Sequence, residues 1–150
     1  MKRIVVLMIM VVIIAGCSTS EKTTACTMNL GEEEEIKTLI TLTSNDDKVV
    51  KIVTENTVDL KKTSSYIEAS ELEDYGKGLS ETYSAIKGVS YSYQLDKSEF
   101  KEILEITITD KNFETLKNGG LLSGYVDGDD KEVSLKLVKN YLETREMKCK

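Results

Sequence analysis

The 150-residue sequence contains no histidine. Histidine is the side chain that most often changes charge near neutral pH, the usual base of serine and cysteine triads, and a common ligand of zinc and copper. Its absence excludes those sites in their ordinary form. Catalysis by a pair of carboxylates or by a Ser-Lys pair needs no histidine, so an enzyme of that kind stays open as an alternative.

Basic residues are in the minority, with 20 Lys and Arg against 26 Asp and Glu and a formal net charge of −6. Nucleic acids bind surfaces that carry an excess of positive charge. We therefore expect no nucleic-acid partner. The chain also lacks a glycine-rich phosphate loop and a dinucleotide-binding fingerprint, and we expect no cofactor.

Two acidic runs are candidate ligand sites. Asp127-Gly128-Asp129-Asp130 could offer carboxylate oxygens to calcium, but its spacing departs from the calcium-loop pattern. We expect a solvated turn there and no metal site. Glu32–Glu35 is expected to form the charged tip of a hairpin, the alternative being a receptor for cationic ligands, and its repulsion from anionic lipids could orient the domain.

A long apolar run is also missing. Residues 4–14 are consecutively apolar and follow Lys2 and Arg3, yet a transmembrane helix needs about 20 such residues. The run and the small residues after it predict a bacterial signal peptide over residues 1–16, the alternative being an uncleaved membrane anchor. Ile14, Ala15, Gly16 and Cys17 resemble a lipobox, which implies recognition by a dedicated signal peptidase and a lipid on the Cys17 sulfur.

The lipobox resemblance implies a location and an anchor. Two or more acyl chains on Cys17 would hold the protein stably on the extracytoplasmic face of the cell membrane. We expect residues 17–25 to comprise this cysteine and a polar tether, and residues 26–150 to form a single domain, since that length suits one hydrophobic core. Membrane attachment would then need nothing from the domain itself.

Cys26 and Cys149 are the two cysteines that stay available once Cys17 is assigned to lipid. Thiols outside the cytoplasm tend to oxidise, so we expect a disulfide between them. The loop that it would close corresponds to roughly 4 to 5 kcal/mol of stabilisation in the chain-entropy model. The alternative is two buried thiols that never meet, and a redox-active pair is disfavoured because the spacing is not Cys-x-x-Cys.

Alternating apolar and polar residues predict strands. Residues 26–30, 36–43 and 49–60 suggest an antiparallel meander, and residues 89–95 and 104–108 suggest two later strands. Ser70-Glu71-Leu72-Glu73 matches a capping box, which predicts a helix that begins at Ser70 and ends near Gly88. Phe113 and Leu116 suggest a short helical turn, and Ser134 is expected to cap a last helix. Residues 147–150 are expected to add a short strand that brings Cys149 to the sheet.

These elements predict an α+β fold with an antiparallel β-sheet of about five to six strands, packed by one long central helix and a shorter C-terminal helix. The segments Gly88–Tyr93, Glu105–Asp110 and Val133–Lys136 together resemble the YehR-like small bacterial lipoproteins, over most of the mature chain. The resemblance implies the same α+β fold, and it adds no active site because the family is uncharacterised. The cysteine pair and Thr144-Arg145-Glu146, where a Gly-Phe turn is more usual, depart from the family pattern.

Aromatic residues are seven tyrosines and two phenylalanines. Tyr83, Tyr91 and Tyr93 are predicted where the long helix packs on the strands, so we expect them in the core, the alternative being a tyrosine-lined groove for sugars or peptides. We expect a non-catalytic domain that binds a protein or small ligand. The alternative is a carboxylate-dependent enzyme acting on cell-envelope material, which would show two inward-facing acidic side chains in one cleft.

Overall fold

The computed structural model describes residues 21–31, 35–63 and 68–150. The predicted signal peptide over residues 1–16, the lipobox residues Ile14, Ala15 and Gly16, and Cys17 lie outside these ranges, as does most of the acidic run Glu32–Glu35. Within the described ranges, no helix combines the length and the apolar character needed to cross a membrane.

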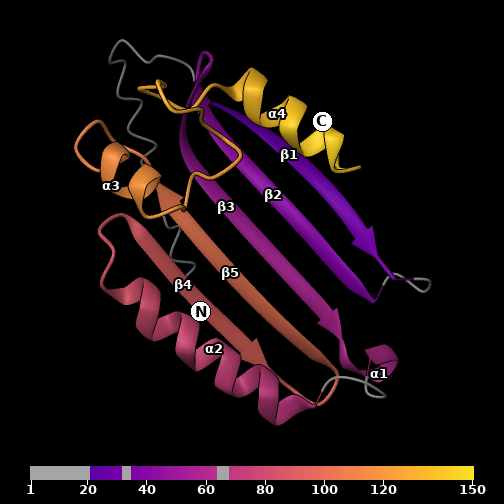
Figure 1. Ribbon diagram of the computed structural model, residues 1–150. Coiled ribbons are helices and arrows are strands. Elements are labelled where there is room, and N and C mark those ends of the chain that lie inside the picture. Colours follow the sequence, from indigo (N-terminus) through magenta and orange to yellow (C-terminus); the bar gives the residue numbers. More distant parts are fainter. Residues whose placement is uncertain (1–20, 32–34, 64–67) are drawn as a thin grey trace, which may run out of the picture.

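Six strands form one antiparallel sheet in the order β4-β5-β3-β2-β1-β6 (Figure 1). The first three strands form the predicted meander, and β4 and β5 form a second hairpin that pairs with β3 through β5. The strands are β1 (Glu21–Leu30), β2 (Ile36–Asn45), β3 (Lys48–Asp59), β4 (Val89–Leu95), β5 (Glu99–Thr107) and β6 (Lys148–Cys149).

The helices in the described part of the chain are α1 (Leu60–Thr63), α2 (Ala69–Ser84), α3 (Phe113–Asn118) and α4 (Leu135–Thr144). We expected one long central helix, and the longest helix in the described ranges is α2. With 16 residues, α2 lies along the edge strand β4, while α4 lies near β1 and β2 at the other end of the sheet (Figure 1). The ribbons of β3 and β5 lie between the two helices.

Two local predictions need correction. Strand β1 begins at Glu21, so residues 21–25 belong to the sheet and not to the predicted tether. The β-branched Thr23 and Thr24 pair with Thr43 and Leu42 of β2, which explains the earlier start.

The N-cap of α2 lies two residues before the predicted one, Ser70. Glu68 is the N-cap, with an extended backbone, and the Glu71 side chain accepts a hydrogen bond from the Glu68 backbone N–H at 3.5 Å. Ser70 therefore lies inside the first turn. Gly88 has the predicted left-handed conformation, with φ of +86°, but the helix has already ended at Ser84 and Gly88 forms the turn into β4.

The end of α4 explains how the chain returns to the sheet. The Glu146 and Met147 N–H groups donate to the carbonyl oxygens of Glu143 at 3.0 Å and Leu142 at 3.1 Å. This pattern is a Schellman motif, whose left-handed position usually holds glycine. Here that position is Glu146, with φ of +66°. The turn then directs Lys148 and Cys149 into β6.

One face of the sheet carries the helices and the core. The larger hydrophobic cluster joins β1, β2, β3 and β5 to α3 and α4, and a smaller cluster lies under α2. Buried members of the larger cluster include Cys26, Ile40, Leu42, Ile52, Ile106, Phe113, Leu116, Val138 and Leu142. The smaller cluster consists of Val58, Leu60 and Phe100, with Leu72 and Tyr93 packed against it.

Candidate functional site

A row of polar side chains separates the two hydrophobic clusters. Thr38 lies opposite Asn56, Asn56 opposite Glu102, and Glu102 opposite Tyr93 in the strand register. Residues directly opposite one another project from the same face of a sheet. The next row on one side contains Val58 and Phe100, and the next row on the other side contains Thr54 and Leu104. Alternate residues of a strand project from the same face, so the polar row lies on the helix-bearing face with these residues.

Hydrogen bonds join this row to a tyrosine. Thr38 Oγ1 donates to Asn56 Oδ1 at 2.8 Å, and Asn56 Nδ2 donates to Glu102 Oε1 at 2.8 Å. The Tyr91 hydroxyl donates to Glu102 Oε2 at 2.7 Å. Both oxygens of the Glu102 carboxylate are therefore held by neutral donors. Among the described residues, no lysine or arginine forms a salt bridge with Glu102.

Helix α2 forms the second wall of the site. Tyr75, Leu79 and Tyr83 follow one another at four-residue intervals and therefore share one face of the helix. The Tyr83 ring lies 5.7 Å from the Tyr91 ring, centroid to centroid. Together α2 and the sheet enclose a groove of about 170 Å³. Its lining residues are Thr54, Asn56, Tyr75, Leu79, Tyr83, Tyr91, Glu102 and Leu104.

A glycine allows α2 to approach the sheet closely. A Cβ atom added to Gly76 would lie 2.6 Å from Cγ of Tyr93, which is closer than real Cβ contacts allow. Gly78, two residues on, would meet nothing within 4 Å. Gly76 therefore sets the distance between helix and β4, and with it the width of the groove.

Tyr83, Tyr91 and Tyr93 are partly buried where the helix packs on the strands, and Tyr83 and Tyr91 also line the groove. Tyr75 is 50% exposed, and Tyr83, Tyr91 and Tyr93 are each of intermediate exposure. Burial, followed by the hydrogen bond to Glu102, raises the pKa of Tyr91 well above its ordinary value. Burial and then the Glu102 charge raise the pKa of Tyr75. Both hydroxyls are therefore protonated at neutral pH, and Tyr91 acts as a donor.

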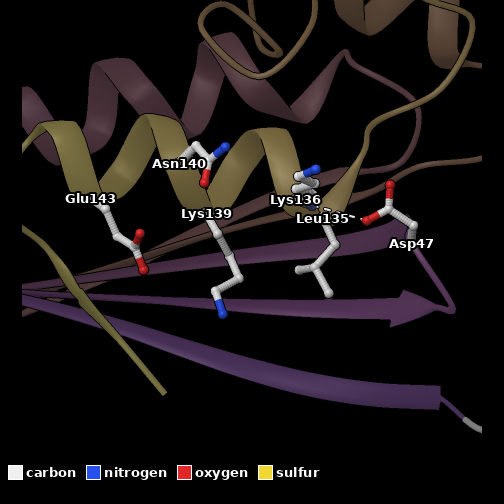
Figure 2. A pocket seen from close by; sticks show the side chains of 6 residues that line it. All are labelled: Asp47, Leu135, Lys136, Lys139, Asn140 and Glu143. Carbon is white, nitrogen blue, oxygen red and sulfur yellow. Dashed lines mark hydrogen bonds between the residues drawn. The ribbon is translucent and has the colours of Figure 1, made fainter.

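A second, wider hollow of about 310 Å³ lies beside α4, and Figure 2 shows its lining residues. Asp47 caps this helix: Oδ2 accepts from Ser134 Oγ at 2.6 Å and Oδ1 from the Lys136 backbone N–H at 3.0 Å. Ser134 is the N-cap, as predicted, and accepts from the Leu137 backbone N–H at 3.3 Å. The Asp47 carboxylate at this hollow thus serves the start of the helix.

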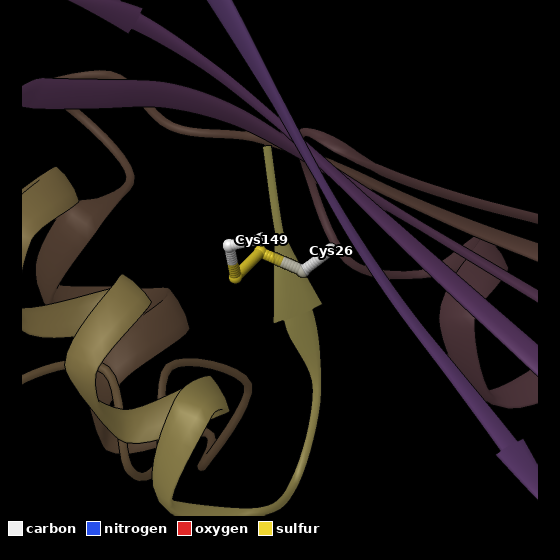
Figure 3. The surroundings of a disulfide bond; sticks show 2 residues. All are labelled: Cys26 and Cys149. Atoms are coloured by element: carbon white, nitrogen blue, oxygen red, sulfur yellow. A yellow bond between two sulfur atoms is a disulfide. The ribbon is translucent and has the colours of Figure 1, made fainter.

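The structure joins Cys26 and Cys149 in a disulfide (Figure 3). The two residues lie directly opposite each other in the β1–β6 register. Backbone hydrogen bonds between Ala25 and Lys150, of 3.1 and 2.9 Å, flank the bond. Cys26 is fully buried in the larger hydrophobic cluster. The bridge ties the end of the chain to the first described strand and leaves no free thiol at either cysteine.

The acidic turn over residues 127–130 contains a lysine ammonium. Lys117 Nζ donates to the carbonyl oxygens of Gly128 at 2.7 Å and Asp130 at 2.9 Å. Asp130 Oδ2 accepts from the Asp127 backbone N–H at 2.7 Å. Across the described part of the chain, no group of three or more Cys, Asp or Glu side chains is placed to hold a metal ion.

The six-stranded sheet with its helices on one face defines a two-layer α+β domain. The chain belongs to the DUF1307 family, described as proteins of unknown function, whose model matches residues 26–148. No curated protein sequence matches it. The family match and the structural neighbours below confirm the resemblance to YehR-like proteins, which are uncharacterised.

Two solved structures have a similar fold. The NMR structure of the Escherichia coli YehR protein is 16% identical, with a TM-score of 0.61, covering 87% of this chain and 91% of that chain. The NMR structure of a protein from Streptococcus pneumoniae TIGR4 is 15% identical, with a TM-score of 0.51, covering 100% of this chain and 97% of that chain. At these identities the likeness extends to the fold alone.

Proposed function

We propose that this protein is a lipoprotein, held on the extracytoplasmic face of the cell membrane through a lipid on Cys17, whose domain binds a ligand without catalysis. The groove between α2 and the sheet carries the binding part of this proposal. It combines partly exposed aromatic rings with one carboxylate that two hydrogen bonds hold in place. Ligand sites typically have apolar and aromatic walls with a small number of polar groups. The lipid part is supported by the lipobox-like sequence that ends at Cys17.

The carboxylate arrangement favours binding over the catalytic alternative. A carboxylate-dependent hydrolase needs two acidic groups that face one reacting bond. Glu102 is the one acidic residue among those that line the groove. Its neighbours along the strand, Lys101 and Glu105, instead form ion pairs with Glu55 and Lys51 of β3.

The lipid anchor is tested by labelling cells with palmitate. We expect the full chain to incorporate the label and the Cys17→Ala variant to lose it. Cys149→Ser is the matched control, because it removes a sulfur from the same chain but leaves Cys17, and it should stay labelled. Equal labelling of the wild type and Cys17→Ala would refute the anchor.

The binding site is tested by placing a photoreactive amino acid at Leu79, which lines the groove, or at Ser92, which is exposed and projects from the opposite face of the sheet. After irradiation of intact cells, we expect a defined adduct, detected by mass spectrometry, at Leu79 and none at Ser92. Identical adducts at both positions, or none at Leu79, would contradict a binding role for the groove.

A further inference from the structure

The Glu102 carboxylate differs from two nearby carboxylates of the sheet, Glu55 and Glu105, in how its charge is balanced. Glu55 lies 2.9 Å from Lys101 Nζ, and Glu105 lies 2.9 Å from Lys51 Nζ. Glu102, on the helix-bearing face, has an amide and a phenol as partners. These donors orient the carboxylate, but they do not neutralise it. The groove therefore has an uncompensated negative charge at its base.

The carboxylate keeps unused acceptor capacity. An ionised carboxylate offers about four lone-pair positions, two on each oxygen. Asn56 uses one position on Oε1 and Tyr91 one on Oε2. Each oxygen can thus accept another hydrogen bond from a group in the groove.

The aromatic residues around the carboxylate favour the same kind of ligand. The faces of tyrosine rings carry partial negative charge and attract cations. Tyr75, Tyr83 and Tyr91 all line the groove with Glu102. The remaining walls include Leu79 and Leu104, which suit a short alkyl chain. A groove of about 170 Å³ has room for one group of side-chain size.

We propose that this groove binds an alkylammonium group, with the ammonium at Glu102 among the tyrosine rings and the alkyl chain against Leu79 and Leu104. This inference rests on the proposed binding function and names the chemistry of its ligand. A lysine side chain and a free amine share this chemistry. An anion would be repelled by Glu102, and a neutral alcohol would gain neither the ion pair nor the cation–π attraction.

The test uses the isotope-labelled full chain in dodecyl maltoside, a detergent without an ammonium group, with binding followed by NMR shifts of backbone amides. The probes are butylammonium for a free amine, Nα-acetyl-lysine amide for a lysine side chain, butan-1-ol as the neutral analogue of equal length, and butyrate as the anion. We expect the ammonium probes to shift amides near Leu79 and Glu102. The neutral and anionic probes should bind at least roughly tenfold more weakly.

Variants assign the binding to the groove. Glu102→Gln should weaken ammonium binding by roughly tenfold. Glu105→Gln makes the same charge change on the same strand but on the opposite face, and it should bind like the wild type. Tyr83→Phe, which keeps the ring, should bind more tightly than Tyr83→Leu. The two Tyr83 variants carry the test if Glu102→Gln fails to fold, which amide shift dispersion would reveal.

Several results would overturn the proposal: no shift with either ammonium probe, butan-1-ol binding as tightly as butylammonium, or equal losses from Glu102→Gln and Glu105→Gln. A response to Nα-acetyl-lysine amide alone would support a lysine side chain, and a response to butylammonium alone a free amine. An adduct at Leu79 in cells without ammonium binding would overturn the ligand assignment and leave the binding function standing. Ammonium binding without that adduct would support the ligand assignment and contradict a binding role for the groove in cells.

Discussion

Reduction of the Cys26–Cys149 disulfide is expected to destabilise the domain by several kcal/mol. The bonded residues are 123 positions apart, and a loop of that length corresponds to about 5 kcal/mol in the chain-entropy model. A domain of this size has a free energy of unfolding of roughly 5–15 kcal/mol. Loss of the bond therefore removes a large share of the stability and leaves the reduced domain close to unfolding.

After reduction, the loss of structure should begin at β6. This strand has only two residues, and so short a strand has little stability without its covalent link. The Lys150 amide, which donates to the Ala25 carbonyl at 2.9 Å, should exchange its hydrogen much faster after reduction. Helix α4 should keep more protection, because Val138 and Leu142 remain buried in the core.

The measurement is urea unfolding of the oxidised protein, the protein in reductant, and the Cys26→Ser/Cys149→Ser variant. We expect the last two to share a midpoint well below that of the oxidised protein. Cys17→Ser is the control for other thiol chemistry, and its midpoint should still fall on reduction. An unchanged midpoint in reductant would refute the argument.

Three further predictions concern single residues. Glu146→Gly should raise stability by about 0.5–1 kcal/mol in urea unfolding, because glycine adopts the left-handed φ of +66° without strain, whereas Arg145→Gly, at φ of −100°, should lower it. Gly88→Ala should cost at least roughly 2 kcal/mol, since a Cβ there meets Asn112 and the φ is +86°; a thermal midpoint equal to that of the wild type would contradict this. Because the pKa of Tyr91 is raised on folding, its contribution to stability is complete below about pH 10 and declines as pH rises toward the folded-state pKa. The stability of the Tyr91→Phe variant should therefore fall less steeply than that of the wild type as pH rises in the alkaline range, as followed by circular dichroism. An identical pH profile for the two proteins would count against the assigned environment of Tyr91.

Much of the strand pattern could be predicted because period-two alternation is a local signal. The meander and the β4–β5 hairpin follow directly from it. The helix start was less predictable. Glu68-Ala69-Ser70-Glu71 and Ser70-Glu71-Leu72-Glu73 overlap, and serine is the better N-cap by intrinsic preference. The helix begins earlier because Ala69 is a strong helix former and Glu71 faces the Glu68 backbone N–H.

The candidate site left a weaker signal in the sequence. Glu102 lies in phase with Phe100, Leu104 and Ile106, so it occupies a core-facing position of its strand. Asn56 similarly lies in phase with Ile52 and Val58. A polar residue in such a position indicates a special environment. What the sequence could not show is that β3 lies beside β5, which places these two residues opposite each other.

Asp47 illustrates the same limit. Its carboxylate caps a helix whose first residue is far along the chain, through hydrogen bonds to Ser134 and Lys136. The turn itself was predictable from its composition. The contact depends on packing between distant segments, which no local pattern encodes.

The Lys117 ammonium, which lies in the turn over residues 127–130, affects how this turn responds to its ionic surroundings. This ammonium, bound to the carbonyls of Gly128 and Asp130, is a positive ion covalently attached to the polypeptide. Chelators do not extract it, dilution does not deplete it, and competing divalent ions must displace a built-in rival. The turn thus has a permanent cation of its own, whatever the ionic composition of the surroundings.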